Sequence, residues 1–251
     1  MSLKNLVIKI SLKEFFSKKK IFFSKNKNGI IIVKNAVNKK KIRNILRKIL
    51  KSKKNYVKKP LIVEGVKNVC WTHNFKVEKL KKKQYATIGK SWYFFPWNKD
   101  KTGIVKITSS IFKRVNELNG YDDNKVQKNT PKDKIIKRIQ VIFYPHGTGL
   151  ISLHKDPVNV IKITAGIYVT EYNTDYDKGG FYIIKNKKKY FLDHFVKAGD
   201  LVLFRPSIIH AVDPVYKSKP HSKNIFKGRI FLNLSLVQSH EVKKRTYSVG
   251  V

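Results

Sequence analysis

The spacing of hydrophobic and polar positions changes near residue 136 of this 251-residue chain. After Asn38, apolar residues recur at intervals of three and four, which is the period of an amphipathic helix with Asn38 as its N-cap. A second helix is predicted over 107–118, capped by Thr108 or Ser109. The first half of the chain is therefore predicted to supply helices, each with one apolar face.

From residue 136 onward, valine, isoleucine, phenylalanine and tyrosine alternate with other residues in short runs that turn residues separate. Five runs have this pattern: 138–144, 160–169, 179–185, 200–206 and 229–237. Several short strands in succession are typical of a sandwich or barrel. We predict a single domain over 1–251, mostly β with flanking helices (α+β), with an N-terminal arm, strand and supporting helices over 1–135 and the β core over 136–240.

Two apolar stretches of the N-terminal half do not follow the helical period. Residues 29–33 read as a short buried strand, and residues 92–97 form the aromatic cluster WYFFPW. Large aromatic side chains usually supply buried area, so core packing is favoured for the cluster over a role as the wall of a substrate pocket.

The formal charge is +39, from 55 lysine and arginine residues against 16 aspartate and glutamate residues. Two interpretations stay open: a polyanionic partner such as nucleic acid or an anionic lipid surface, or the lysine-rich composition of an AT-rich genome. Acidic residues gather within 156–213, so the basic bias is strongest outside that segment.

Cys70 is the only cysteine, which excludes an intrachain disulfide and favours a reducing compartment. Lysines at 4, 9 and 13 interrupt any apolar core of a signal peptide. No apolar run approaches the roughly 20 residues of a transmembrane helix. We expect a cytoplasmic protein without a transmembrane segment, and its oligomeric state cannot be read from the sequence.

The strongest chemical signal is the H-x-D tripeptide His154-Lys155-Asp156, with His210 54 residues after Asp156. In an extended strand, residues i and i+2 point to the same side, so His154 and Asp156 can reach one metal ion. Two neutral imidazoles and one carboxylate are the ligand set that non-haem Fe(II) oxygenases use, with the opposite face of the ion left open.

Arg229 opens the last predicted strand, and strand alternation places Arg229, Phe231, Asn233 and Ser235 on one face. A guanidinium pairs with a carboxylate at two points, which suits the far end of an α-keto diacid. The alternative for Arg229 is a surface ion pair. Arg205 is the rival anchor, although its position before Pro206 suits a loop or salt-bridge role better.

The stretch from about 138 to 237 resembles the Fe(II)/2-oxoglutarate-dependent oxygenases, in particular their phytanoyl-CoA-dioxygenase-like and prolyl-hydroxylase-like branches. The matching elements are FYPHGTGLISLHKD (143–156), TAGIYVTEY (164–172), the Gly179-Gly180 pair, AGDLVLFRPSIIHAV (198–212) and GRIFLNLS (228–235). The resemblance implies a double-stranded β-helix, or jelly roll. It also implies that His154, Asp156 and His210 are the catalytic iron ligands.

By the same resemblance, Arg229 binds the distal carboxylate of 2-oxoglutarate, and Tyr144 is a weaker candidate for the same cosubstrate. Strand parity adds Asn233 as a residue of the pocket lining. The cofactors implied are Fe(II), 2-oxoglutarate and O2, with ascorbate as an optional reductant.

The activity implied is hydroxylation of a C–H bond with release of succinate and CO2. The expected substrate is a small metabolite, anionic if Lys217, Lys219, Lys223 and Lys227 attract it. Asp156 argues against a halogenase, which needs a small residue there. Ser235 stands where nucleic-acid demethylases of the AlkB type carry a second arginine, so nucleic acid is not favoured. The alternatives are the same chemistry on a protein or nucleic acid, and an inactive jelly-roll binding protein.

Overall fold

The computed structural model describes residues 6–17, 29–51, 56–57, 69–75, 87–128, 134–216 and 226–238. Its helical segments are α1 (Leu12–Ser17), α2 (Lys39–Lys51), α3 (Ile104–Asn119), α4 (Asp123–Val126) and the 3-10 turn η3 (Asp193–Phe195). The strands before residue 146 are β1 (Val7–Ile10), β2 (Ile30–Val33), β3 (Tyr56–Val57), β4 (Val69–Phe75), β5 (Thr87–Phe94) and β6 (Ile135–Pro145). The later strands are β7 (Leu150–His154), β8 (Thr164–Tyr168), β9 (Lys178–Lys185), β10 (Lys188–Phe191), β11 (Leu201–Phe204), β12 (His210–Tyr216) and β13 (Gly228–Gln238).

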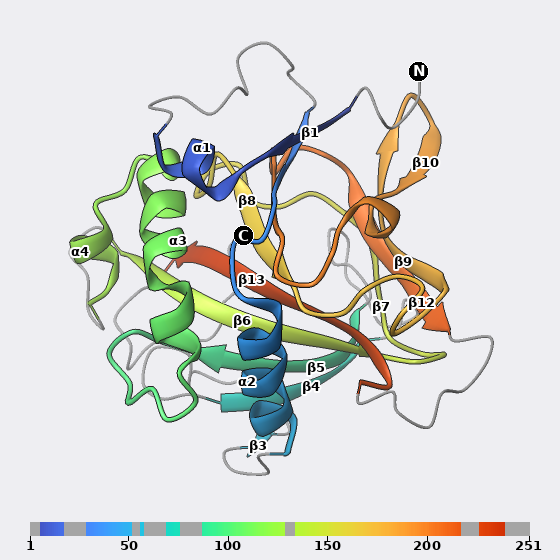
Figure 1. Ribbon diagram of the computed structural model, residues 1–251, viewed down its shortest axis with the longest axis horizontal. Coiled ribbons are helices and arrows are strands. Elements are labelled where there is room, and N and C mark those ends of the chain that lie inside the picture. The colour runs from blue at the N-terminus through green and yellow to red at the C-terminus, as the bar shows by residue number, and fades with distance from the viewer. Residues whose placement is uncertain are drawn as a thin grey trace.

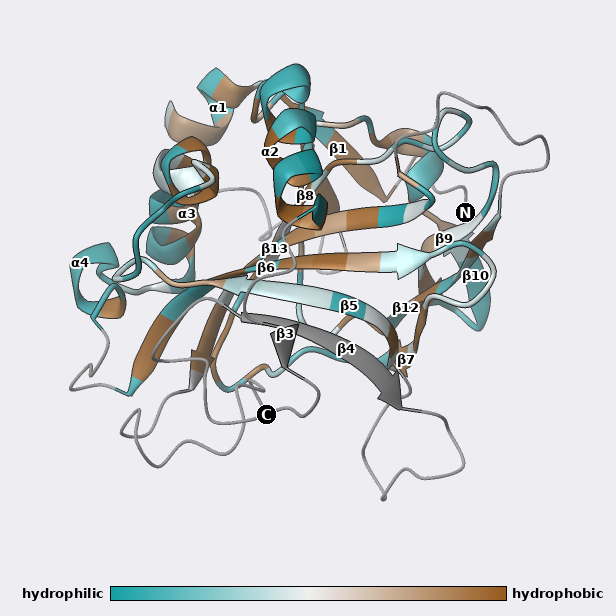
Figure 2. Cartoon of the chain, turned by 90° about the horizontal axis from the view of Figure 1, so that it is seen from below, coloured by the Kyte–Doolittle hydropathy of each residue, from teal (hydrophilic) through white to brown (hydrophobic). Residues whose placement is uncertain are grey.

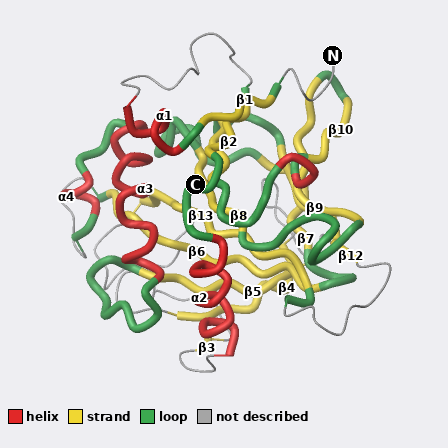
Figure 3. Tube along the Cα trace, in the orientation of Figure 1, coloured by secondary structure: helices red, strands yellow, loops and turns green. Residues whose placement is uncertain are grey.

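The strands form one sheet with two parts that meet at β5. The large part runs β1-β2-β11-β8-β13-β6-β5, with β4 and β3 beyond β5, and the small part runs β7-β12-β9-β10. Only two residue pairs join β5 to β7, Thr87 with Ile151 and Ile88 with Leu150. Helices α2 and α3 lie over one face of the large part of the sheet (Figures 1 and 2). In the view of Figure 3, these helices lie in front of the strands.

Strand alternation divides the core into two apolar layers. On β2, Ile31 and Val33 pack under the helices, whereas Ile30 and Ile32 pack in the second layer, against residues of the small part such as Phe181 and Val212. All four residues of β2 are buried, because the strand is covered on both faces. This arrangement agrees with the mostly β, jelly-roll fold with flanking helices that the sequence predicts.

The predicted strands are confirmed, with bounds that differ by a few residues. The helix after Asn38 is also confirmed, and the Asn38 side chain accepts a hydrogen bond from the Lys41 N–H (2.9 Å) as an N-cap does. The aromatic cluster is core as expected, since Trp92, Tyr93, Phe94 and Phe95 are buried.

The start of the second predicted helix was wrong. Helix α3 begins at Ile104, and the carboxylate of Asp100 accepts the N–H groups of Gly103 (2.8 Å), Ile104 (3.1 Å) and Lys106 (2.9 Å). The Thr108 hydroxyl instead donates to the Ile104 carbonyl within the helix (2.8 Å). The cap therefore comes from an aspartate upstream of the helix.

Basic residues of the N-terminal half attach this half to the acidic segment of the core. Arg43 of α2 binds both carboxylate oxygens of Asp175 at 2.8 Å, and Lys39 binds Glu171 at 2.8 Å. Lys34 pairs with the fully buried Asp200. Part of the positive charge thus has a structural use, and the positive and negative ends of these pairs lie far apart in the sequence.

Two further observations concern the limits of the described chain. Within it, no helix is long and apolar enough to cross a bilayer. The lysines expected near the mouth of the site, Lys217, Lys219 and Lys223, and the side chain of Cys70 lie outside the residues that the structure describes.

Candidate metal centre

The structure brings the three residues of the predicted triad together on the small part of the sheet. His154 ends β7, His210 begins the antiparallel strand β12, and the two histidines are direct cross-strand partners with ring centroids 4.2 Å apart. Asp156 follows β7, and its N–H donates to the carbonyl of Pro206 (3.0 Å) in the loop that leads to His210. Residues 54 positions apart therefore share one end of a strand pair.

The potential ligand atoms face a common point. Nε2 of His154 lies 4.0 Å from Oδ1 of Asp156, and Nε2 of His210 lies 3.7 Å from Oδ2 of Asp156. One ligand atom from each residue lies within 4.8 Å of the other two. Ligands at about 2.1 Å from one octahedral ion lie roughly 3 Å from one another, so small side-chain rotations bring this set into coordination.

Hydrogen bonds behind the triad fix the orientation of each side chain. Nδ1 of His154 lies 2.8 Å from the Ser152 carbonyl, and Nδ1 of His210 lies 2.9 Å from the Ile208 carbonyl. A carbonyl can only accept, so each Nδ1 carries the proton and each Nε2 keeps its lone pair for a metal. The Thr164 hydroxyl donates to Oδ2 of Asp156 (2.6 Å) and holds that carboxylate.

The electrostatics also suit a cation. Burial and, to a smaller extent, the neighbouring His210 together lower the pKa of His154 to about 4, against the raising effect of Asp156. The imidazole of His154 is therefore neutral near pH 7, which is the form that binds metals. Two imidazoles and one carboxylate match the donor set expected for Fe(II).

Arg229 lies on the large part of the sheet and is buried, with 1% of its surface exposed. Its Nε donates to Oδ2 of Asp193 (2.8 Å) and its Nη2 donates to Oδ1 of Asp193 (3.2 Å). The ion pair that was weighed as an alternative for Arg229 therefore exists, but it lies in the core and not on the surface. The role of Arg229 toward a cosubstrate stays a prediction.

The Asp193 carboxylate receives three more hydrogen bonds in this cluster. Tyr168 donates to Oδ1 (2.7 Å), and Tyr176 (2.6 Å) and the backbone N–H of Phe181 (3.0 Å) donate to Oδ2. Burial raises the pKa of Tyr168 and of Tyr176 well above 10, and the charge of Asp193 raises both further. Both tyrosines are therefore neutral donors, and Arg229 and Asp193 carry the only formal charges of this group.

Aromatic rings surround the Arg229 guanidinium. Its central carbon lies 4.9 Å from the ring centroid of Tyr168, 5.4 Å from Phe231, 5.8 Å from Phe181 and 6.0 Å from Tyr144. Tyr144 thus lies beside Arg229, and its predicted contact with the cosubstrate stays a prediction. Asn233 lies four residues further along β13, opposite Gln140 and Gly166, and its place in a pocket lining stays a prediction.

Two residues of this region, Thr164 and Asp193, were not identified from the sequence. A signal for Asp193 exists in the Gly179-Gly180 pair. A Cβ atom on Gly180 would lie 2.2 Å from Oδ2 of Asp193, and the φ of Gly180 is +107°. Glycine at position 180 therefore leaves room for the Asp193 carboxylate. The sequence alone does not show which side chain fills that space.

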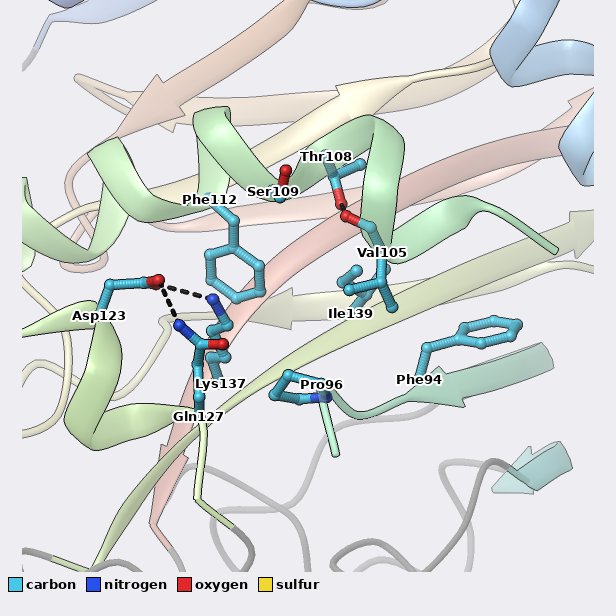
Figure 4. Close-up of a pocket in the computed structure, with 10 residues that line it drawn as sticks. All are labelled: Phe94, Pro96, Val105, Thr108, Ser109, Phe112, Asp123, Gln127, Lys137 and Ile139. Carbon is cyan, nitrogen blue, oxygen red and sulfur yellow. Dashed lines mark hydrogen bonds and ion pairs between the residues drawn. The ribbon is translucent and has the colours of Figure 1, made fainter. Parts of the chain in front are cut away.

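A separate hollow lies between α3, α4 and β6, and none of the triad residues line it (Figure 4). Its polar groups bind one another: Asp123 accepts hydrogen bonds from Lys137 (2.7 Å) and Gln127 (2.6 Å). Since the polar groups drawn there are satisfied within the protein, the hollow does not compete with the triad as the candidate site.

Comparison with known proteins supports the fold. No family model and no curated protein matches the sequence. A prolyl hydroxylase from Trichoplax adhaerens, solved with a peptide of the hypoxia inducible factor oxygen degradation domain, matches with TM-score 0.50 and 13% identity over 96% of this chain and 91% of its own. A Pseudomonas putida prolyl-4-hydroxylase matches with TM-score 0.49 and 11% identity over 91% of this chain and 97% of its own. The chain is thus similar in fold to a prolyl hydroxylase, which agrees with the resemblance in the sequence.

Proposed function

We propose that this protein is an Fe(II)- and 2-oxoglutarate-dependent dioxygenase that hydroxylates a C–H bond. The observation that carries the proposal is the convergence of His154, Asp156 and His210, with both Nε2 atoms turned toward the carboxylate. Such a triad holds one face of an iron ion and leaves the opposite positions for cosubstrate and O2. The jelly-roll fold supports the same proposal.

In this mechanism His154, Asp156 and His210 would hold the metal, and Thr164 would keep the Asp156 carboxylate in place. When bound, iron together with 2-oxoglutarate and O2 supplies the oxidising power, and the protein supplies orientation and exclusion of water. Phe181 and Phe204 pack against the His210 ring, with centroids 5.5 Å and 5.0 Å away. These rings fix His210 and keep its buried side dry.

The proposed substrate is a small metabolite, and a protein side chain is the second candidate. The second candidate is supported by the Trichoplax hydroxylase of similar fold, whose structure contains a bound peptide. A screen that offers metabolites and peptides to the same preparation separates the two, because only the true substrate accelerates consumption of 2-oxoglutarate and gains one oxygen atom.

The test of the proposed activity is conversion of 2-oxoglutarate to succinate by the purified full chain under air. We expect succinate with Fe(II) and none with Zn(II), and we expect His154→Ala to abolish the reaction. His194→Ala is the matched control, since His194 is exposed and its ring lies against Tyr172, away from the triad residues. Full turnover by His154→Ala would contradict the assignment of the site.

A further inference from the structure

The cation expected to hold the distal carboxylate of the cosubstrate is already paired within the protein. Arg229 donates hydrogen bonds from Nε and Nη2 to Asp193. Among the described residues, Nη1 has no hydrogen-bond acceptor. A guanidinium recognises a carboxylate best through two adjacent N–H groups. With Nε and Nη2 bonded to Asp193, a ligand carboxylate could reach only the edge formed by Nη1 and Nη2, and Asp193 already cancels the charge of that guanidinium.

Asp193 is built into this position. Its side chain is fully buried, and five donors from four residues hold its two oxygens. Gly180 leaves the space that the carboxylate fills. Removing Asp193 from this position would leave Arg229 and two tyrosine hydroxyls without their acceptor, so the pair is a lasting part of the fold.

The charges lead to the same conclusion. The facing groups are Arg229 from β13, Asp193 from η3, Tyr168 from β8 and Tyr176 from the connection between β8 and β9, and their formal charges sum to zero. A second carboxylate would add a negative charge to a buried and already neutral group, which is unfavourable without a new cation.

An uncharged tail has better partners here. The Phe181 ring contacts both the Arg229 guanidinium (5.8 Å) and the His210 ring (5.5 Å), so an apolar surface connects the metal centre to the buried pair. Phe231 and Tyr144 extend this aromatic surface around the guanidinium. Such walls stabilise methyl and methylene groups through burial.

We propose that this site accepts 2-oxo acids whose far end is uncharged at least as well as 2-oxoglutarate, and that Asp193 is the residue that sets this preference. The proposal rests on the proposed function and extends its cosubstrate class to 2-oxo acids with an uncharged far end. Asp193 acts as a positioning residue, because it works through Arg229 and by cancelling its charge.

The test compares 2-oxoglutarate with 2-oxopentanoate, which has the same five-carbon chain and a methyl group in place of the distal carboxylate. Both acids are titrated by calorimetry into the full chain loaded with Mn(II), without O2, so that affinity is read without turnover. We expect dissociation constants within about threefold of each other. A preference of tenfold or more for 2-oxoglutarate overturns the inference but leaves the proposed function intact, whereas a metal-loaded protein that binds neither acid contradicts both.

The variant Asp193→Asn keeps the shape and removes the charge. Because Arg229 then carries an uncancelled charge, we expect the affinity ratio to move toward 2-oxoglutarate by about tenfold or more, the size of a charge-assisted hydrogen bond. An unchanged ratio in a folded variant overturns the role of Asp193. Asp213→Asn, the same change at the partly exposed partner of Lys189, is the control and should leave the ratio as in the wild type. The comparison of the two acids in the wild type stands even if Asp193→Asn does not fold.

Discussion

The metal triad lies on the small part of the sheet, whereas the Arg229–Asp193 pair joins the large part to the small part, and the two sites differ in what they leave unsatisfied. In the triad, two imidazole nitrogens and a carboxylate converge within 4.8 Å. In the Arg229 cluster, the carboxylate is surrounded by five donors and the charges cancel. A bound cation would stabilise the triad, whereas the charges and hydrogen bonds of the Arg229 cluster are already satisfied without a ligand.

The difference shows that an aspartate carboxylate can belong to a metal site in one place and to a complete ion pair in another. Lone pairs that converge without donors between them point to a metal, because only a cation relieves their mutual repulsion. A buried arginine points to a ligand only when its donors are not already taken.

Breaking the buried pair should cost more stability than removing it. Arg229→Met leaves Asp193 buried without its cation, and we expect a loss of about 3–5 kcal/mol in the free energy of unfolding. The double variant Asp193→Asn/Arg229→Met removes both charges and keeps an amide oxygen that can accept from the tyrosine hydroxyls, and we expect it to recover part of that loss. Urea unfolding of the set gives the coupling between the two sites. Losses of the single variants Arg229→Met and Asp193→Asn that add up to the loss of the double variant would show that the pair is not coupled.

The space beside Asp193 can be tested through glycine. Gly180→Ala combines a φ of +107° with a Cβ atom 2.2 Å from the buried carboxylate. We expect it to destabilise the protein by more than the roughly 1–2 kcal/mol of left-handed backbone strain alone. Gly103→Ala is the control, since its φ is +82° but its nearest neighbour lies 3.9 Å away. Equal losses in the two variants, measured by thermal unfolding, would argue against a tight fit around Asp193.

At the metal site, a hydroxyl that holds a ligand carboxylate in place should affect the affinity for the metal as well as the stability of the protein. Thr164→Val keeps the shape but removes the hydroxyl that donates to Asp156. We expect affinity for Fe(II) or Mn(II) to fall by about tenfold. Thr170→Val removes a buried hydroxyl that bonds the backbone of Ile230, so it should lower stability without changing metal affinity. Metal affinity that falls equally in both variants would contradict a specific role for Thr164.

The smallest effect concerns acid stability where α2 meets the core. Burial acts to raise the pKa of Glu171, but hydrogen bonds from Lys39 and the Ala198 N–H outweigh it and lower the pKa below 4.5. A lowered pKa means that the carboxylate stabilises the fold above pH ~4.5 and loses this contribution as the pH falls through its folded-state value.

We therefore expect Glu171→Gln to be less stable than the wild type at pH 6, with the difference shrinking by pH 3.5. Glu117→Gln, at a more exposed i,i+3 pair with Arg114, should show a smaller change over the same range. Urea unfolding at the two pH values measures both. A difference for Glu171→Gln that grows as the pH falls would reverse the expected sign.

The features that the sequence predicted depend on the order of residues close together in the chain. Strands β7 and β12, which pair His154 with His210, were not among the predicted runs. The five β runs predicted β6, β8, β9, β11 and β13, and strand alternation predicted that His154 and Asp156 share one side. These features follow from periods of two residues and from the order of a few motif residues, both of which are visible in a single chain.

The parts that the sequence did not predict depend on long-range register. Asp193 lies 36 residues before Arg229, in a 3-10 turn without periodicity, and their contact requires the packing of η3 against β8, β9 and β13. The cap of α3 was missed because Asp100 precedes the helix by four residues and acts through Gly103. In both cases a short acidic side chain binds a partner that local spacing does not reveal.

Binding of Fe(II) to the triad is the most direct test of the central claim. Under anaerobic conditions, equilibrium dialysis with metal analysis should give one Fe(II) per chain in the wild type and in the control His194→Ala. His210→Ala, which removes the ligand opposite His154, should lower the affinity by more than ~100-fold. Wild-type affinity and stoichiometry in His210→Ala would contradict the assignment of the iron site.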